Sequence, residues 1–196
     1  MKRNVLAALG ILSAAVPLAA ILASISMSPW FTWTGSFLSN LGEEGFPALV
    51  FNAGLIAGGL MGTTFAFCLL KEKFYESTWG LRLFMLATIS LIFVGVFPVQ
   101  TDTPHTAASV AFFLLSTASL LTMGFTERKG GKMGWFFLAL GIISLTALPL
   151  YAVPRPWGFN ATVEMVTSLG MSVFTAATAV MILRKSPAAG KKAKSG

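Results

Sequence analysis

The only histidine of the 196-residue chain, His105, follows Asp102 by three positions. A carboxylate that holds an imidazole can make the ring a general base, and a serine such as Ser39 would then be the nucleophile of a hydrolase. A zinc site normally uses three or four ligands with His or Cys among them, so we expect no metal and no other cofactor. The structural alternative is that Thr103 caps a helix start here, which requires no catalysis.

His105 and Glu164 each precede a row of hydroxyl side chains at helical spacing. The rows are Ser109, Ser116 and Ser119 after the histidine, and Ser168, Thr175 and Thr178 after the glutamate. An ionisable residue inside an apolar segment usually faces protein or water, which makes Glu164 a functional candidate. Alternatively, Glu164 reaches interfacial water or pairs with Arg155. The two rows predict either a polar seam that opens outward or close packing of helices through small side chains.

Further polar residues lie in the short polar breaks that separate long apolar segments of the chain, or just inside such a segment. Asn52 needs a partner in an apolar run, which is either another helix or a ligand. A mixed group of acids, amides and one arginine suits a zwitterionic headgroup, a metal or a small solute, and it also fits an ordinary solvated loop. The residues that we expect to bind ligand are Asn40, Asn52, His105, Ser109, Arg155 and Glu164.

Six long apolar segments must position these residues. They cover about 5–27, 47–70, 79–97, 105–125, 134–152 and 160–183. A membrane-spanning helix needs about 20 predominantly apolar residues. The chain therefore predicts an all-α fold, a six-transmembrane-helix bundle formed by one domain over 1–183. The basic tail at 184–196 is expected to be disordered.

The basic residues indicate how such a bundle is oriented. All Lys and Arg except Arg155 flank one side of the predicted membrane, and this bias is typical of the cytoplasmic side. We therefore expect a multi-pass protein of the cell membrane with both termini in the cytoplasm and membrane lipids as partners. The formal charge of +7 does not indicate nucleic acid as a partner, because the cations lie at helix ends rather than on one folded face.

Two small-residue features of the second segment have a structural and a functional interpretation. Gly54, Gly58 and Gly62 repeat every four residues, which favours helix–helix association through one narrow face, or else a gating surface. Cys68, the only cysteine, is either a small core residue or a palmitoylation site beside Lys71.

Several short motifs resemble a prokaryotic six-helix membrane family of unknown function that is related to the Frag1/DRAM/Sfk1 group. The motifs are Leu38-Ser39-Asn40-Leu41-Gly42, Phe51-Asn52-Ala53-Gly54-Leu55 with Gly58-Gly59, Val94-Gly95-Val96-Phe97-Pro98, and His105. The resemblance implies the same fold, an outward-facing cluster of Ser39, Asn40, Asn52 and His105, and a role in membrane lipid organisation. That family often has aspartate at the position of Asn40, which weakens an acid–base role there.

Three functions remain open from the sequence. The first is a non-enzymatic protein that binds a lipid or small polar ligand in an outward-facing pocket between the second, fourth and sixth helices. The second is a membrane-embedded hydrolase that uses Asp102, His105 and Glu164 with a serine or a metal. The third is a small transporter or channel lined by the hydroxyl rows, although no internal repeat supports it.

Overall fold

The computed structural model describes residues 1–149 and 160–184, and this part of the chain contains helices and no strand. Its elements are α1 (Arg3–Ser26), η1 (Leu38–Gly42), α2 (Gly45–Lys71), α3 (Thr78–Val96), η2 (Val99–Thr101), α4 (Thr103–Glu127), η3 (Arg128–Gly130), α5 (Lys132–Ala147) and α7 (Asn160–Arg184), where η denotes a 3₁₀ helix. The all-α prediction is confirmed for the described residues.

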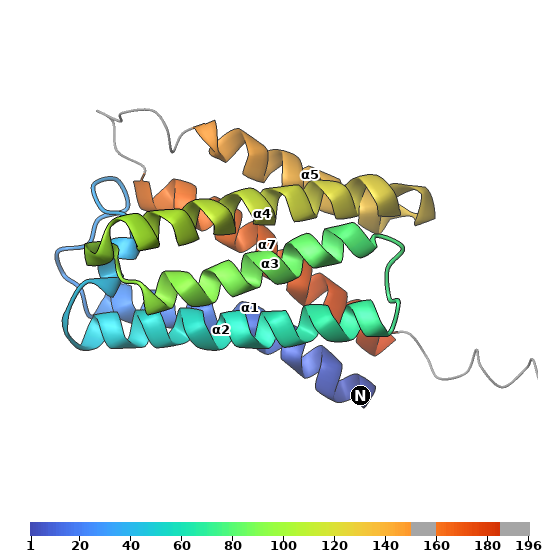
Figure 1. The fold of residues 1–196 in the computed structure, drawn as a ribbon, viewed down its shortest axis with the longest axis horizontal. Coiled ribbons are helices and arrows are strands. Elements are labelled where there is room, and N and C mark those ends of the chain that lie inside the picture. Colours follow the sequence, from blue (N-terminus) through green and yellow to red (C-terminus); the bar gives the residue numbers. More distant parts are fainter. Residues whose placement is uncertain (150–159, 185–196) are drawn as a thin grey trace, which may run out of the picture.

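The long helices lie side by side (Figure 1). Their contacts close into a ring. Each of α1 to α4 contacts the next helix in the chain, and α7 contacts both α5 and α1. We call the end that holds residues 27–44, η2 and the start of α7 the loop end. The opposite end, which holds the starts of α1 and α5 and the end of α7, is called the terminal end.

Five of the helices are long and apolar enough to cross a membrane: α1, α2, α3, α4 and α7. The exception is α5, which has 16 residues and ends at Ala147 rather than continuing to 152 as the sequence predicted. At about 1.5 Å per residue it is roughly 24 Å long, against about 30 Å for the bilayer core. Pro149 lies just beyond this end and has no amide hydrogen for the helical ladder. Residues 150–152 and most of the expected tail lie outside the described residues.

The glycine stripe of α2 contacts helices of the same chain. A Cβ added at Gly54 would lie 2.1 Å from the Cβ of Ala20, and one at Gly58 would lie 2.7 Å from the Pro17 ring. Gly62, on the same helix, approaches α3 as well as α1. These distances leave no room for larger side chains, so the stripe sets how closely α1 and α3 approach α2.

An aromatic plug fills the terminal end of the ring. Tyr75, in the turn between α2 and α3, inserts between the helices with its hydroxyl 2.9 Å from Thr178 Oγ1. Its ring lies 6.0 Å from Phe137 and 6.4 Å from Phe174, and Phe84 lies 5.3 Å from Phe174. Burial raises the pKa of the Tyr75 hydroxyl, so the group stays protonated inside the plug.

Candidate functional site

Glu164 fastens the start of α7 to the η1 segment, which we define as residues 36–43. Its Oε2 accepts a hydrogen bond from the Leu38 amide at 2.5 Å. One turn earlier, the Ala161 amide donates to the Ser36 carbonyl at 2.9 Å. The carboxylate is half-buried and compensates an amide at the start of a 3₁₀ helix. Segments more than a hundred residues apart are thereby joined at the loop end.

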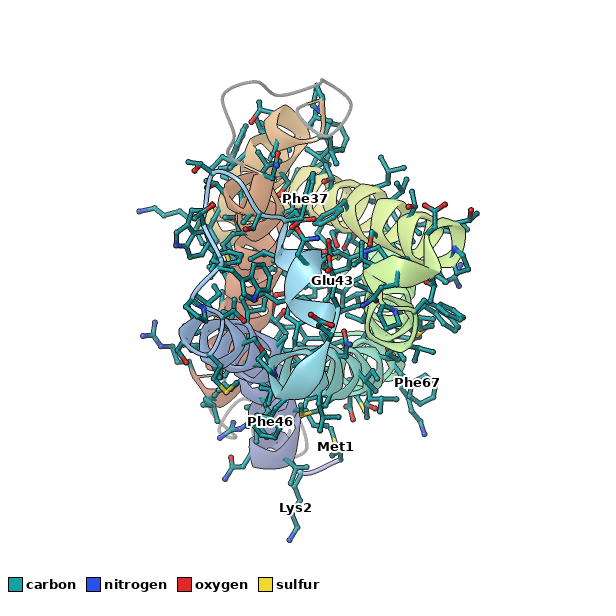
Figure 2. All side chains as sticks on the ribbon, turned by 90° about the vertical axis from the view of Figure 1, so that its left-hand side faces the viewer. Met1, Lys2, Phe37, Glu43, Phe46 and Phe67 are labelled. Atoms are coloured by element: carbon teal, nitrogen blue, oxygen red, sulfur yellow. The ribbon has the colours of Figure 1, made fainter. Side chains whose placement is uncertain are left out.

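Two asparagines hold the rest of the η1 segment. Asn40 Oδ1 accepts from the Phe37 amide at 2.8 Å, and its Nδ2 donates to Glu43 Oε1 at 2.5 Å. Asn52, which projects from α2, donates through Nδ2 to the Gly42 carbonyl at 3.1 Å. Figure 2 looks onto the loop end, where η1 lies between the labelled Phe37 and Glu43 over the middle of the ring.

These hydrogen bonds position the η1 segment, and the two asparagine side chains do not line a cavity. Asn40 and Asn52 line none of the cavities described below, although the sequence placed both in the ligand site. Gln100 adds a further tie, because its side-chain amide donates to the Glu43 carbonyl. The segment is therefore held by α2, α7 and the loop before α4.

His105 is buried in the first turn of α4 and uses both ring nitrogens. Nδ1 lies 2.8 Å from the Phe97 carbonyl, and Nε2 lies 3.2 Å from Ser109 Oγ. A carbonyl can only accept, so Nδ1 carries the hydrogen. In the neutral ring, Nε2 then accepts from the Ser109 hydroxyl. This is a serine–histidine pair on one helix face, oriented by a backbone carbonyl.

Asp102 does not take part in this pair. Its carboxylate is exposed, and the Nδ1 hydrogen bond that a catalytic aspartate would accept goes to Phe97. Asp102, rather than Thr103, occupies the position before α4, and its carbonyl accepts from the Thr106 amide at 2.9 Å. Thr103 is the first helical residue, so the predicted threonine cap is wrong. Within residues 1–149 and 160–184, no three His, Cys, Asp or Glu side chains lie together as a metal site would require.

A cavity of about 390 Å³ opens at the loop end between α4, the end of α5 and the start of α7. We call it the mouth cavity. Its polar lining is Ser39, His105, Thr106, Ser109 and Glu164, and its apolar lining is Phe37, Val99, Val110, Phe113, Leu114 and Leu148. Four residues that the sequence singled out, from three distant segments, thus share one space. Arg155 lies outside the described residues.

Two smaller cavities continue from the mouth cavity toward the centre of the ring. The middle cavity, of about 50 Å³, shares Ser39, Ser109, Phe113 and Glu164 with the mouth cavity. The central cavity, also about 50 Å³, shares Ile21, Leu55, Leu91, Phe112 and Ser168 with the middle one. Because neighbouring cavities have walls in common, they form one series. Its ionisable side chains, His105 and Glu164, line the mouth and middle cavities, and the polar groups of the central cavity are hydroxyls alone.

The hydroxyl rows contribute unequally to this series. On α7, Ser168 and Thr175 line the central cavity, whereas Thr178 is fully buried and bonded to Tyr75. On α4, Ser119 donates to the Gly80 carbonyl at 2.9 Å and lines none of these cavities. Phe84 of the aromatic plug forms part of the central cavity wall. Within the described residues, the series of cavities therefore ends at the aromatic plug.

The important partners in this region that sequence reasoning missed are mostly backbone groups. The Leu38 amide and the Phe97 carbonyl have no side-chain signature, and only the fold brings them to Glu164 and His105. Tyr75 could have been identified from the sequence more easily than these backbone groups, because it is an aromatic residue inside a short charged break. Such a residue often folds back onto the protein when its ring can be buried.

An all-helical ring with five apolar helices of spanning length is the build of a multi-pass membrane protein. The family described as protein of unknown function (DUF998) matches residues 11–181, and the chain belongs to this family. Comparison with curated proteins and with solved structures finds no match.

Proposed function

We propose that the protein crosses the cell membrane six times, with α5 as its shortest span, and binds a lipid or small polar ligand from outside the cell. The observation that carries this proposal is that the mouth and middle cavities share Ser39, Ser109 and Glu164. An entrance with ionisable and hydroxyl groups among apolar walls thus leads inward to cavities lined by apolar side chains and hydroxyls. At about 390 Å³, the mouth cavity falls within the range of roughly 300–1,000 Å³ typical of small-molecule sites.

The distribution of charge supports the orientation. The described Lys and Arg all lie at the terminal end: Lys2, Arg3, Lys71, Lys73, Arg82, Arg128, Lys129, Lys132 and Arg184. The described charges of the loop end are carboxylates alone: Glu43, Glu44, Asp102 and Glu164. Retained cations favour the cytoplasmic side, so the terminal end, with the start of α1 and the end of α7, faces the cytoplasm.

Cysteine labelling tests this orientation in intact cells. In a Cys68→Ala background, Glu44→Cys should react with a membrane-impermeant maleimide, and Lys129→Cys should react only after the cells are opened. Both positions are exposed, so reactivity reports the side of the membrane. The reverse pattern would refute the orientation.

The lining favours an amphiphile over a freely diffusing ion. Ser39, Ser109 and Glu164 supply hydrogen-bonding groups for a polar head, and Val110 and Leu114 supply an apolar wall for a chain. Burial of apolar ligand surface drives such binding, while the few polar groups select the head. A relationship to the Frag1/DRAM/Sfk1 group, with its role in lipid organisation, belongs to the same proposal.

Filling the cavity tests ligand binding directly. Val110 lines the mouth cavity and is 50% exposed, and Ile142 on α5 is equally exposed but lines none of the cavities. Val110→Trp should lower the co-purified amphiphile that native mass spectrometry detects by about tenfold, equivalent to roughly 1.4 kcal/mol. Ile142→Trp should leave it unchanged. Equal ligand content in both variants and the wild type would refute the site.

A second function, a membrane-embedded hydrolase, is favoured by the contact between Ser109 and His105 at 3.2 Å. A base within hydrogen-bond reach can take the serine proton during attack on an ester or amide. Covalent labelling by a fluorophosphonate tests this idea. Labelling of the wild type that is lost in Ser109→Ala and His105→Gln would support it, and absence of labelling in the folded wild type would reject it.

A further inference from the structure

A groove of about 730 Å³ runs along the outside of the ring at the terminal end, far from the mouth cavity. It lies between the last two turns of α2 and the first three turns of α3. Its lining is Phe67, Leu70, Lys71, Trp79, Arg82, Met85 and Leu86. None of these residues lines the mouth, middle or central cavity, so the groove is a separate feature.

The groove has a cationic rim. Lys71 and Arg82 are both exposed, and within the described part of the chain neither forms an ion pair. The neighbouring acid, Glu72, instead lies 3.6 Å from the amino group of Met1. The Arg82 guanidinium lies 4.8 Å from the centre of the Trp79 ring, which holds it near the groove. An anion that enters here meets two cations.

The walls below the rim are apolar and face outward. Phe67 precedes Lys71 by one turn of α2 and is 56% exposed, and Leu86 follows Arg82 by about one turn of α3 and is 46% exposed. One turn corresponds to roughly 5–6 Å along a helix. The side chain of Phe67 projects away from the bundle (Figure 2). The surface therefore changes from cationic to apolar with increasing distance from the terminal end.

We propose that this groove binds one anionic glycerophospholipid from the leaflet next to the terminal end. Its phosphate lies between Lys71 and Arg82, and one acyl chain follows Phe67 and Leu86 into the bilayer. The order of charge and apolar surface along the groove matches the order of headgroup and chain in a lipid. Basic pockets between spanning helices recognise acidic lipid headgroups in this way. Trp79 lies at the level of the headgroups, where indole rings prefer to reside.

Lipid titration of the purified full-length protein tests the proposal, with phosphatidylglycerol as the probe and phosphatidylcholine as the neutral comparison. Native mass spectrometry should show preferential retention of phosphatidylglycerol. Lys71→Gln and Arg82→Gln should each weaken it about fivefold, and the double variant about 30-fold. The control is Lys129→Gln/Lys132→Gln, which removes two exposed cations at the same end but outside the groove. It should change retention less than twofold.

Further measurements distinguish a lipid held in the groove from an anion attracted by diffuse charge. Phe67→Ala/Leu86→Ala keeps both cations and should still lower the retention of phosphatidylglycerol. Glycerol 3-phosphate, which has the phosphate but no acyl chain, should compete only weakly. Equal loss in the control, or full competition by the free phosphate, would overturn the proposal in favour of diffuse charge or headgroup binding alone. If the Lys71→Gln/Arg82→Gln double variant does not fold, the two single variants decide. Val110→Trp should leave phosphatidylglycerol bound in the groove, so a failure of the ligand proposal for the mouth cavity can be told apart from a failure of the groove proposal.

Discussion

Glu164 on α7 accepts a hydrogen bond from the backbone amide of Leu38, 126 residues earlier in the chain, at 2.5 Å. Removal of the carboxylate leaves this amide without its acceptor, and hydrogen bonds to charged groups contribute about 1.5–3 kcal/mol. We expect Glu164→Ala to lower the free energy of unfolding by about 2 kcal/mol and Glu164→Gln by about half as much. Thermal unfolding in detergent measures both. The control is Thr162→Ala, an exposed site on the same turn, and an equal loss there would contradict the role of Glu164.

Gly42 and Asn52 should show coupled effects. A Cβ at Gly42 would lie 2.7 Å from Asn52 Oδ1 and 3.1 Å from Phe51 Cδ1. Gly42→Ala should therefore cost about 1–3 kcal/mol through overpacking. In an Asn52→Ala background the closest of these contacts is gone, so the same substitution should cost less. A double-mutant cycle on unfolding free energies measures the difference, and strict additivity would show that the two residues do not interact.

Tyr75 should make stability depend on alkaline pH. Burial raises the pKa of its hydroxyl in the folded protein, whereas the unfolded group titrates near its usual value of about 10. The folded state therefore holds the proton more tightly, and the stabilisation is complete below about pH 10 and declines as the pH rises above it. Tyr75→Phe should lose about 1 kcal/mol at neutral pH, because the bond to Thr178 is absent.

The comparison that isolates this ionisation is the slope of the unfolding temperature against pH. Between about pH 9.5 and 11 the wild type should lose stability faster than Tyr75→Phe, since only the wild type carries the hydroxyl. Thr64→Val, an exposed hydroxyl on α2, serves as a control that keeps the wild-type slope. Parallel slopes for wild type and Tyr75→Phe would mean that Tyr75 ionises as easily folded as unfolded.

Asp102 has a backbone φ of 57°, a value that L-residues seldom adopt. Strain of this kind costs about 1–3 kcal/mol, and glycine relieves it. We expect Asp102→Gly to be more stable than Asp102→Ala by about 1 kcal/mol, because alanine keeps the strain. Thermal unfolding of the two variants is the measurement. An alanine variant as stable as the glycine variant would indicate that the turn relaxes.

The sequence was most informative where one physical effect dominates. Apolar runs specify the helices, and proline and charged breaks mark their ends, so the helical fold was predictable. The end of α5 was harder to place, because the segment around Pro149 remains apolar and hydropathy continues past the helix terminus. The helix ends because Pro149 has no amide hydrogen to continue the helical hydrogen bonding, and hydropathy does not report this.

The candidate site was predictable only in part. Ser39, His105, Ser109 and Glu164 do line one cavity. For His105, Ser109 and Glu164 the signal was polar character within apolar segments, and Ser39 was singled out as a candidate nucleophile in the break after the first segment. Asn52 was expected beside them but turns to the Gly42 carbonyl, a choice set by the path of the η1 segment. Side-chain patterns do not encode where a loop carbonyl will lie.

The position of α7 has a consequence for biosynthesis. The ring closes only when α7 enters between α5 and α1, where it brings Ala179 against Gly10 of α1. Ribosomes make this helix after the other helices of the ring, so every nascent chain passes through a stage with an open slot beside α1. A truncation after residue 149 would leave that slot permanently vacant and mark the product for membrane quality control. The ring is thus completed only after α7 has been made, by the helix that also carries Glu164.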